Sequence, residues 1–151
     1  MGFITLAHII KKITGQSVSE FAQGNIFQSL GMKDTFFNPP EEYIDRCVPT
    51  EVINGIPLKG AVHDPLARLQ GGISGNAGLF STAGDLAVFA RMLLNKGKYK
   101  NTRILSPLAV ERMTELCREV SFSGRGLGWD LDSSYSSNGG ELSKVELNHE
   151  I

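Results

Sequence analysis

Hydrophobic positions recur at helical spacing near the start of the chain. Residues 3–13 carry an apolar stripe followed by Gly15, which predicts an amphipathic helix that ends there. Ser17 and Glu20 then form a capping box ahead of a second apolar set, which Gly31 closes. The two stripes consist of Phe3, Leu6, Ile9, Ile10 and Ile13, and of Phe21, Ile26, Phe27 and Leu30. We therefore expect two consecutive helices in this region.

A third apolar stripe lies within residues 82–95. Thr82 and Asp85 have the spacing of a capping box with Asp in the place of Glu, so a helix is expected to begin there. Its hydrophobic positions are Leu86, Phe89, Ala90, Leu93 and Leu94. Ser106 followed by Pro107 predicts a further helix over about 107–118, because proline at the first helical position has no N–H to lose.

Residues 46–80 show no hydrophobic periodicity. Turn-forming residues are frequent there, and Asn54–Gly55 predicts one short hairpin inside a long ordered loop. Farther on, the segment Leu127–Leu131 around Trp129 is typical of a strand, and residues 133–151 of a mobile tail. A loop as long as 46–80 in a compact domain is usually functional, so it is the first place to search for a site.

Composition narrows the classes of protein without selecting one. With 15 Lys+Arg against 16 Asp+Glu, the chain has no charge bias toward nucleic acid or an anionic membrane. Apolar stretches are short and interrupted by charges, so neither a transmembrane span nor a signal peptide is expected. The histidines are scattered, and we expect no metal and no cofactor. Cys47 and Cys117 lie in no cysteine framework, which favours two buried free thiols over a disulfide.

Seven short motifs follow one another along residues 2–132. They are Gly2–Phe3 before an apolar helix, TGQSVSEF, IFQSLGMKDTFF, VHDP, GNAGLFSTAGDLAVFARMLL, RILSP and GLGWDL. Their order resembles the serine β-lactamase and penicillin-binding-protein-like superfamily, most closely its class C-like and esterase-like members. The resemblance implies a partial domain, mainly α with a little β. It would comprise the helical lobe of the β-lactamase/transpeptidase-like α/β fold, over about 2–120, and the first strand returning to the sheet, over about 126–132.

The catalytic motifs of that superfamily are absent from the sequence. No serine is followed by a lysine three positions later, and Lys/His-Thr/Ser-Gly does not occur. The Tyr-x-Asn pattern occurs at Tyr99–Asn101, in a loop between helices rather than ahead of the Gly-Phe helix, and we interpret it as coincidence. The chain thus resembles an interior fragment of a serine hydrolase, and we assign it no catalytic residue.

Two parts of the long loop are candidate substrate contacts. The resemblance places Asn76, Ala77 and Gly78 on the wall of the substrate cleft, whereas the alternative is a glycine turn that only leads into the helix. His63 and Asp64 either line the cleft, as an imidazole beside a carboxylate, or simply start a turn. Ser74 lacks the second glycine of a nucleophile elbow, and we interpret it as a turn serine bonded to its own backbone.

Two classes of function remain open. The favoured hypothesis is a fragment, inactive by itself, of a β-lactamase-related serine hydrolase. Its full-length parent would hydrolyse a β-lactam, a peptidoglycan peptide or a small ester through an acyl-enzyme. The alternative is a non-catalytic binding or interaction module that retained the helical lobe. The expected partners are the parent's small acyl substrate and, through an unpaired sheet edge, a second copy. Family habit implies an extracytoplasmic location, in the periplasm or cell envelope.

Overall fold

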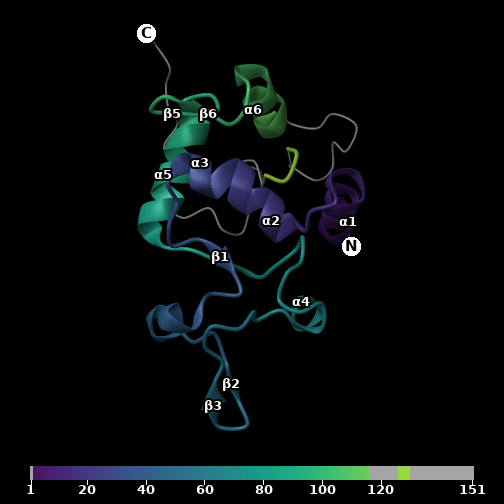
Figure 1. Ribbon diagram of the computed structural model, residues 1–151, viewed down its shortest axis with the longest axis vertical. Helices are drawn as coiled ribbons and strands as arrows, with labels where there is room; N and C mark the ends of the chain where they lie inside the picture. Colours follow the sequence, from purple (N-terminus) through teal and green to yellow (C-terminus); the bar gives the residue numbers. More distant parts are fainter. Residues whose placement is uncertain (1, 116–125, 130–151) are drawn as a thin grey trace, which may run out of the picture.

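The computed structural model describes residues 2–115 and 126–129 (Figure 1). Within these residues helices dominate, and two-residue strands pair antiparallel into three small sheets. The elements are α1 (Gly2–Thr14), α2 (Val18–Ala22), the π-helical turn η1 (Gln23–Phe27), α3 (Gln28–Leu30), β1 (Phe36–Phe37), the 3-10 helix η2 (Glu41–Arg46), β2 (Val52–Ile53), β3 (Ile56–Pro57), α4 (Pro65–Leu69), β4 (Leu79–Phe80), α5 (Ala83–Leu94), β5 (Lys98–Tyr99), β6 (Thr102–Arg103) and α6 (Pro107–Thr114). The prediction of a chain that is mainly α with a little β is confirmed in this coarse form.

The segment from α2 through η1 to α3 is one continuous helical run. Ser17 caps it as predicted: its hydroxyl accepts from the Glu20 N–H at 3.2 Å, and the Glu20 carboxylate accepts from the Ser17 N–H at 2.7 Å. Its middle is a π turn, where the sequence predicted a regular helix. The Asn25 side chain donates to the Phe21 carbonyl at 2.8 Å, so it occupies an acceptor that a regular helix would use.

The core lies where α5 packs against this helical run. Phe27, Leu30 and Met32 form a buried cluster with Met92, whose side chain is completely buried. Partly buried side chains of α5 and of the β5–β6 hairpin surround the cluster; they include Val88, Phe89, Leu93, Tyr99 and Ile104. Close packing of this kind supplies most of the stability of a small domain.

The predicted apolar face of α5 is only half right. Phe89 and Leu93 contact the core, but Leu86 and Leu94 are 54% and 82% exposed, and Ala90 is exposed as well. The helix is turned so that Met92, which the predicted stripe omitted, points at the helical run. Helical spacing alone defines a broad apolar arc, and the packing partner decides which part of the arc is buried.

Helix α1 ends before Gly15, as predicted, but buries none of its residues among those described. Its stripe faces outward, with Phe3 51% and Ile13 78% exposed. The first turn of α1 nevertheless lies directly on the segment before β4, because a Cβ at Gly75 would collide with the Phe3 carbonyl oxygen. The helix therefore backs the loop in which the candidate site residues lie.

The long loop 46–80 contains more regular structure than the sequence predicted. The hairpin is confirmed, with Asn54 and Gly55 both at positive φ between β2 and β3. The short helix α4 was not predicted, although Asp64 and Pro65 are its N-cap and its first residue. The strand β4 closes the loop by pairing with β1, with Phe36 opposite Phe80.

At the far end of the chain, Ser106 and Pro107 start α6 as predicted, and the Ser106 hydroxyl accepts from the Ala109 N–H at 3.1 Å. The predicted strand around Trp129 is not present in its described part. Instead the Gly126 N–H donates to the Trp129 carbonyl at 2.9 Å, which closes a turn. Cys117, the rest of that strand and the tail 133–151 lie outside the described residues, so the unpaired sheet edge stays a prediction. In the described ranges, no helix has both the length and the apolar character needed to cross a bilayer.

Candidate functional site

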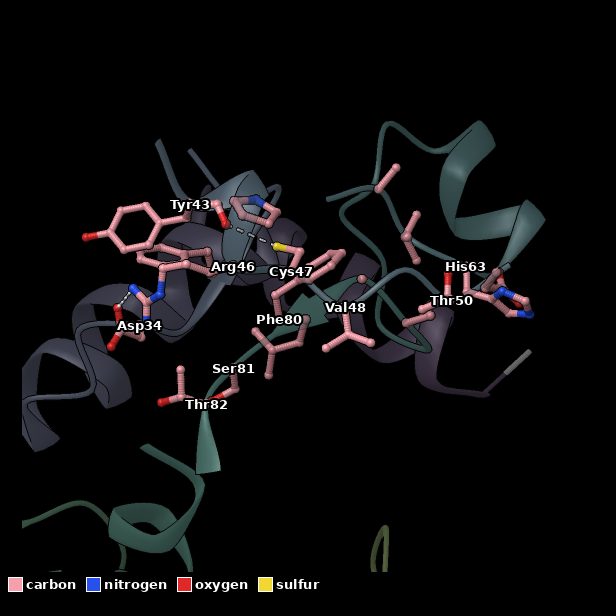
Figure 2. Close-up of a pocket in the computed structure, with 18 residues that line it drawn as sticks. Asp34, Tyr43, Arg46, Cys47, Val48, Thr50, His63, Phe80, Ser81 and Thr82 are labelled. Carbon is pink, nitrogen blue, oxygen red and sulfur yellow. Dashed lines mark hydrogen bonds and ion pairs between the residues drawn. The ribbon is translucent and has the colours of Figure 1, made fainter. Parts of the chain in front are cut away.

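A pocket of about 680 Å³ opens between η2, the β1–β4 pair and the loop segments 47–50 and 61–64 (Figure 2). Four of the five predicted site residues line it, namely His63, Asp64, Ala77 and Gly78. The fifth, Asn76, is not one of its lining residues. The two stretches chosen from the sequence therefore border one cavity, and their role toward a substrate stays a prediction.

Asn76 connects the two stretches from outside the pocket. Its side-chain oxygen accepts from the Ser74 hydroxyl at 2.7 Å, and its side chain is also hydrogen-bonded to the Asp64 carboxylate. Ser74 is 3% exposed. The interpretation of Ser74 as a serine bonded to its own backbone is therefore wrong in detail: the hydroxyl donates to a side chain two residues away. That bond keeps Ser74 in a structural position.

Asp64 is committed to local structure. Its carboxylate accepts from the Ala67 N–H at 2.7 Å and so caps α4. This backbone hydrogen bond holds the pKa of Asp64 below its usual value, and smaller effects of Asn76, Leu66 and His63 act in the same direction. The side chain therefore stays ionised and engaged while it borders the pocket.

His63 has an exposed imidazole, and its nearest carboxylate partner is Glu51 rather than Asp64. The distance from His63 Nδ1 to Glu51 Oε1 is 3.7 Å. Arg68 joins the same group: its Nη2 lies 3.0 Å from Glu51 Oε1 and donates to the His63 carbonyl at 2.8 Å. Through Arg68, this cluster ties the residue before β2 and the residues before α4 to the last turn of α4, and so fixes that side of the pocket.

The turn that carries Ala77 requires glycine after it. Gly78 has φ +110°, and a Cβ there would strike the Gly72 carbonyl oxygen. Glycine is therefore the residue that fits this backbone. The close approach brings Ala77 to the pocket surface just before β4, where its small side chain leaves the cavity open.

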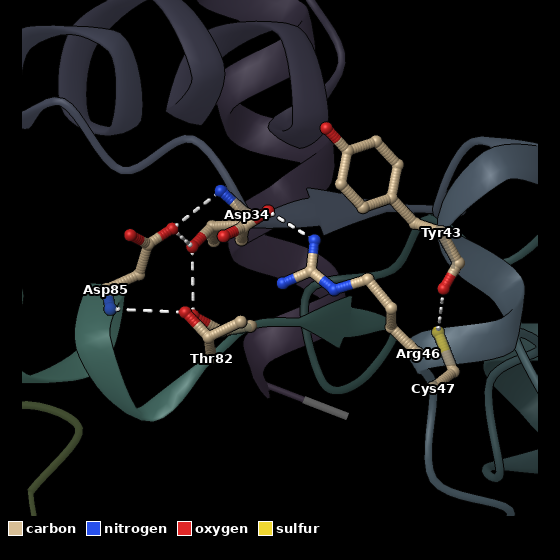
Figure 3. A network of polar contacts seen from close by, with 8 residues as sticks. Asp34, Tyr43, Arg46, Cys47, Thr82 and Asp85 are labelled. Atoms are coloured by element: carbon tan, nitrogen blue, oxygen red, sulfur yellow. Dashed lines mark hydrogen bonds and ion pairs between the residues drawn. The ribbon is translucent and has the colours of Figure 1, made fainter.

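At the edge of the pocket, a polar network joins α5 to the turn after α3 (Figure 3). The Asp85 carboxylate accepts from the Asp34 N–H and from the Thr35 hydroxyl, both at 2.8 Å, and Thr35 is completely buried. Thr82 caps α5 as predicted, accepting from the Asp85 N–H at 3.3 Å. The reciprocal half of the predicted capping box is wrong, because the Asp85 carboxylate is used by the neighbouring turn.

The turn after α3 also carries Asp34, which holds a basic side chain of η2 at the pocket. The Asp34 carboxylate accepts from Arg46 Nη1 at 2.8 Å, and the Arg46 guanidinium lies 5.2 Å from the ring centre of Tyr43. The hydrogen bond from Arg46 lowers the pKa of Asp34, and the pair raises the pKa of Arg46. Sequence reasoning missed these three residues, because no motif marks them and the β1–β4 pairing is what carries them to the cavity.

The described residues contain no cluster of three or more His, Cys, Asp or Glu suited to a metal ion. Tyr99 of the Tyr-x-Asn pattern lies in the β5–β6 hairpin, against the core cluster, and does not line the pocket. Cys47 has a free, half-buried thiol that donates to the Tyr43 carbonyl at 3.5 Å. What the pocket offers chemically is a shaped, mostly apolar surface with polar groups at its margins.

Comparison with known proteins gives the family. The Beta-lactamase family profile matches residues 1–147, and the chain belongs to that family. A relative from Escherichia coli O157:H7, provisionally named a D-alanyl-D-alanine carboxypeptidase, is 29% identical in an alignment 148 residues long that covers 87% of this chain and 34% of the relative. The chain thus spans about a third of the length of the curated relatives it matches.

Solved structures support the fold. A penicillin-binding protein homologue from Pyrococcus abyssi superposes with a TM-score of 0.53 at 24% identity, over 76% of this chain and 24% of the homologue. Simvastatin synthase from Aspergillus terreus gives a TM-score of 0.54 at 20% identity, over 74% of this chain and 27% of the enzyme. At these identities the likeness concerns the fold alone.

Proposed function

We propose that this chain forms one wall of the substrate cleft of a serine hydrolase and does not carry out acyl transfer by itself. The observation behind the proposal is that His63, Asp64, Ala77 and Gly78 border one and the same pocket in a chain of the beta-lactamase family. Its volume suits a small acyl substrate. In this view the described helices are the helical lobe of the family's domain, and the tight turn at Gly78 shapes its cleft wall.

The reaction we propose for the complete enzyme is hydrolysis through an acyl-enzyme. A serine hydroxyl attacks the carbonyl of a β-lactam, a D-alanyl peptide or a small ester while a neighbouring base takes its proton. The C–N or C–O bond then breaks, the leaving amine or alcohol takes up that proton (the amine stays attached in an opened lactam), and water later hydrolyses the acyl–serine ester to the free acid. The activated serine and its lysine would come from sequence beyond these 151 residues, since no Ser-x-x-Lys occurs in them. The residues of this chain would bind and orient the acyl group. Asn76, which lies outside the pocket, would hold the wall and Asp64 in place through its hydrogen bonds to Ser74 and Asp64.

A non-catalytic binding module is the second candidate. It is favoured by the presence of a formed pocket in a chain without the reactive motif. The two candidates differ in one measurable respect: only the first requires that a longer product of the same reading frame become acylated at a serine.

The experiment is covalent labelling followed by mass spectrometry. The 151-residue chain, treated with a fluorescent penicillin or a fluorophosphonate, should give no adduct, because Ser74 is buried and its hydroxyl is engaged by Asn76. A longer in-frame product with an upstream Ser-x-x-Lys should be labelled at that serine. A stoichiometric adduct on any serine of the short chain would contradict the proposal, and Ser74→Ala would show whether that serine is Ser74.

The position of the wall is tested in the same longer product. Ala77→Tyr should slow acylation by a bulky penicillin more than acylation by a small ester, since the new ring fills the pocket. The matched control is Ala109→Tyr, a half-buried position on α6 that does not line the pocket. If Ala77→Tyr slowed acylation by both donors to the same extent, or slowed neither, this loop would be only a hinge into α5.

A further inference from the structure

The pocket is lined on one side by the positively charged side chain of Arg46, which no sequence motif indicated. Figure 2 shows Arg46 beside Asp34 on one side of the pocket and His63 on the other, with Val48 and Phe80 between them. Arg46 and His63 are the two basic residues among the described lining residues. They differ in environment, because His63 faces Glu51, whereas among the described residues Arg46 donates a hydrogen bond only to Asp34.

The Arg46 guanidinium is held in place by its contacts, but only part of its hydrogen-bond donors are used among the described residues. Its one hydrogen bond within residues 2–115 and 126–129 uses Nη1, toward Asp34 at 2.8 Å, and the side chain is 53% exposed. Its contact with the Tyr43 ring and the bond to Asp34 fix the planar group at the pocket edge. Guanidinium carries five N–H donors in a rigid fork, whose geometry matches a carboxylate. The donors that Asp34 leaves over are therefore suited to a second carboxylate.

The lining between the two sides is apolar. Side chains of η2, β1, β4 and the following loop supply it, including Phe36, Val48, Val62, Leu79 and Phe80. A ligand that fills this space needs an apolar body. The cation at one end then favours a body that ends in an acid.

We infer that Arg46 is a specificity residue, which binds a carboxylate at the far end of an apolar acyl group lying in this pocket. The substrate class is accordingly a half-ester, half-amide or lactam whose acyl part is apolar in the middle and acidic at its tip. This inference rests on the proposed function for the reaction, whereas the recognition of the acid by Arg46 can be measured without any reaction.

The test measures ligand binding to the 151-residue chain by NMR titration. The probes are 4-phenylbutyrate and its neutral isostere 4-phenylbutyramide, which share the apolar body and differ in the terminal charge. We expect the acid to bind about tenfold tighter than the amide, and Arg46→Gln to remove that difference. Arg112→Gln is the matched control, because Arg112 is an exposed arginine of α6 that does not line the pocket.

Asp34→Asn separates recognition from a merely structural role of the ion pair. Losing the competing carboxylate should make the acid bind tighter, by about threefold, whereas Arg46→Gln weakens it. If the pair were only structural, both variants would lower stability and neither would separate the acid from the amide. Equal binding of the two probes, no binding of either, or an acid preference that survives Arg46→Gln would overturn the inference. Acylation of a longer product is scored separately, so failure of the proposed reaction leaves this result readable.

Discussion

The core and the pocket wall of this molecule are held together by different forces. The core around Met92 consists of apolar side chains from α5 and the α2–α3 run in direct contact. The wall over residues 34–82 buries few apolar side chains, and instead contains the buried Thr35 and Ser74, each hydrogen-bonded to another side chain. Hydrophobic burial is non-directional and tolerates variation, whereas a buried polar bond depends on one partner in one place. The wall should therefore contribute less to stability than the core, but its conformation should depend more strongly on the identity of individual residues.

The largest expected effect is on the core side of this comparison. Met92→Ala removes a completely buried side chain from the main cluster and should lower the free energy of unfolding by about 2–5 kcal/mol. Denaturant titration followed by circular dichroism measures it. Leu94→Ala is the control on the same helix, because Leu94 is 82% exposed and its loss should change stability by less than about 0.5 kcal/mol. Similar losses for both variants would mean that the described core does not dominate stability.

A smaller effect is expected where the two regions join. Asp85→Ala removes the acceptor of the Asp34 N–H and leaves the Thr35 hydroxyl with only the Ser81 hydroxyl, 2.9 Å away, and should cost about 1–3 kcal/mol. Thr82→Ala removes only the cap of α5 and should cost about 1 kcal/mol. Amide hydrogen exchange distinguishes the two, because Asp85→Ala should also speed exchange in β1 and β4. Equal exchange in those strands for both variants would show that Asp85 does no more than start a helix.

The difference between the regions also explains what the sequence could predict. Capped helices are local features, so Ser17, Thr82 and Ser106 identified three helix starts correctly, and the Asn54–Gly55 hairpin is equally local. The π turn at η1 could have been suspected from the five-residue step between Phe21 and Ile26, which a regular helix does not place on one line. The start of α4 was also available in the sequence, in the Asp64–Pro65 pair.

The rest depended on contacts between distant residues. Which flank of α5 is buried, and the use of Asp85 by Thr35 instead of by its own cap, follow from tertiary packing. For the site, a family resemblance brought attention to Ala77 and Gly78. Nothing in the local sequence indicated Arg46, because its place at the pocket arises from the pairing of Phe36 with Phe80.

The smallest expected effect is the part of the pH dependence of stability that comes from the wall. Asp34 and Asp64 have pKa values below their usual 3.8, through the Arg46 hydrogen bond and the Ala67 N–H respectively. Because the folded state binds protons less readily than the unfolded chain, these carboxylates stabilise the fold at pH values above about 4. Their contribution is lost as the pH falls through the lower, folded-state pKa values.

Denaturant titrations at a series of pH values measure this loss. In the unsubstituted 151-residue chain, the free energy of unfolding should decline below about pH 4. Arg46→Gln should make the decline shallower, because Asp34 loses its partner. Met92→Ala serves as the contrast, since it removes no titrating group. Its plot of unfolding free energy against pH should lie lower than that of the unsubstituted chain but run parallel to it. An Arg46→Gln curve that also runs parallel would mean that the Asp34–Arg46 pair adds nothing to the stability of the wall.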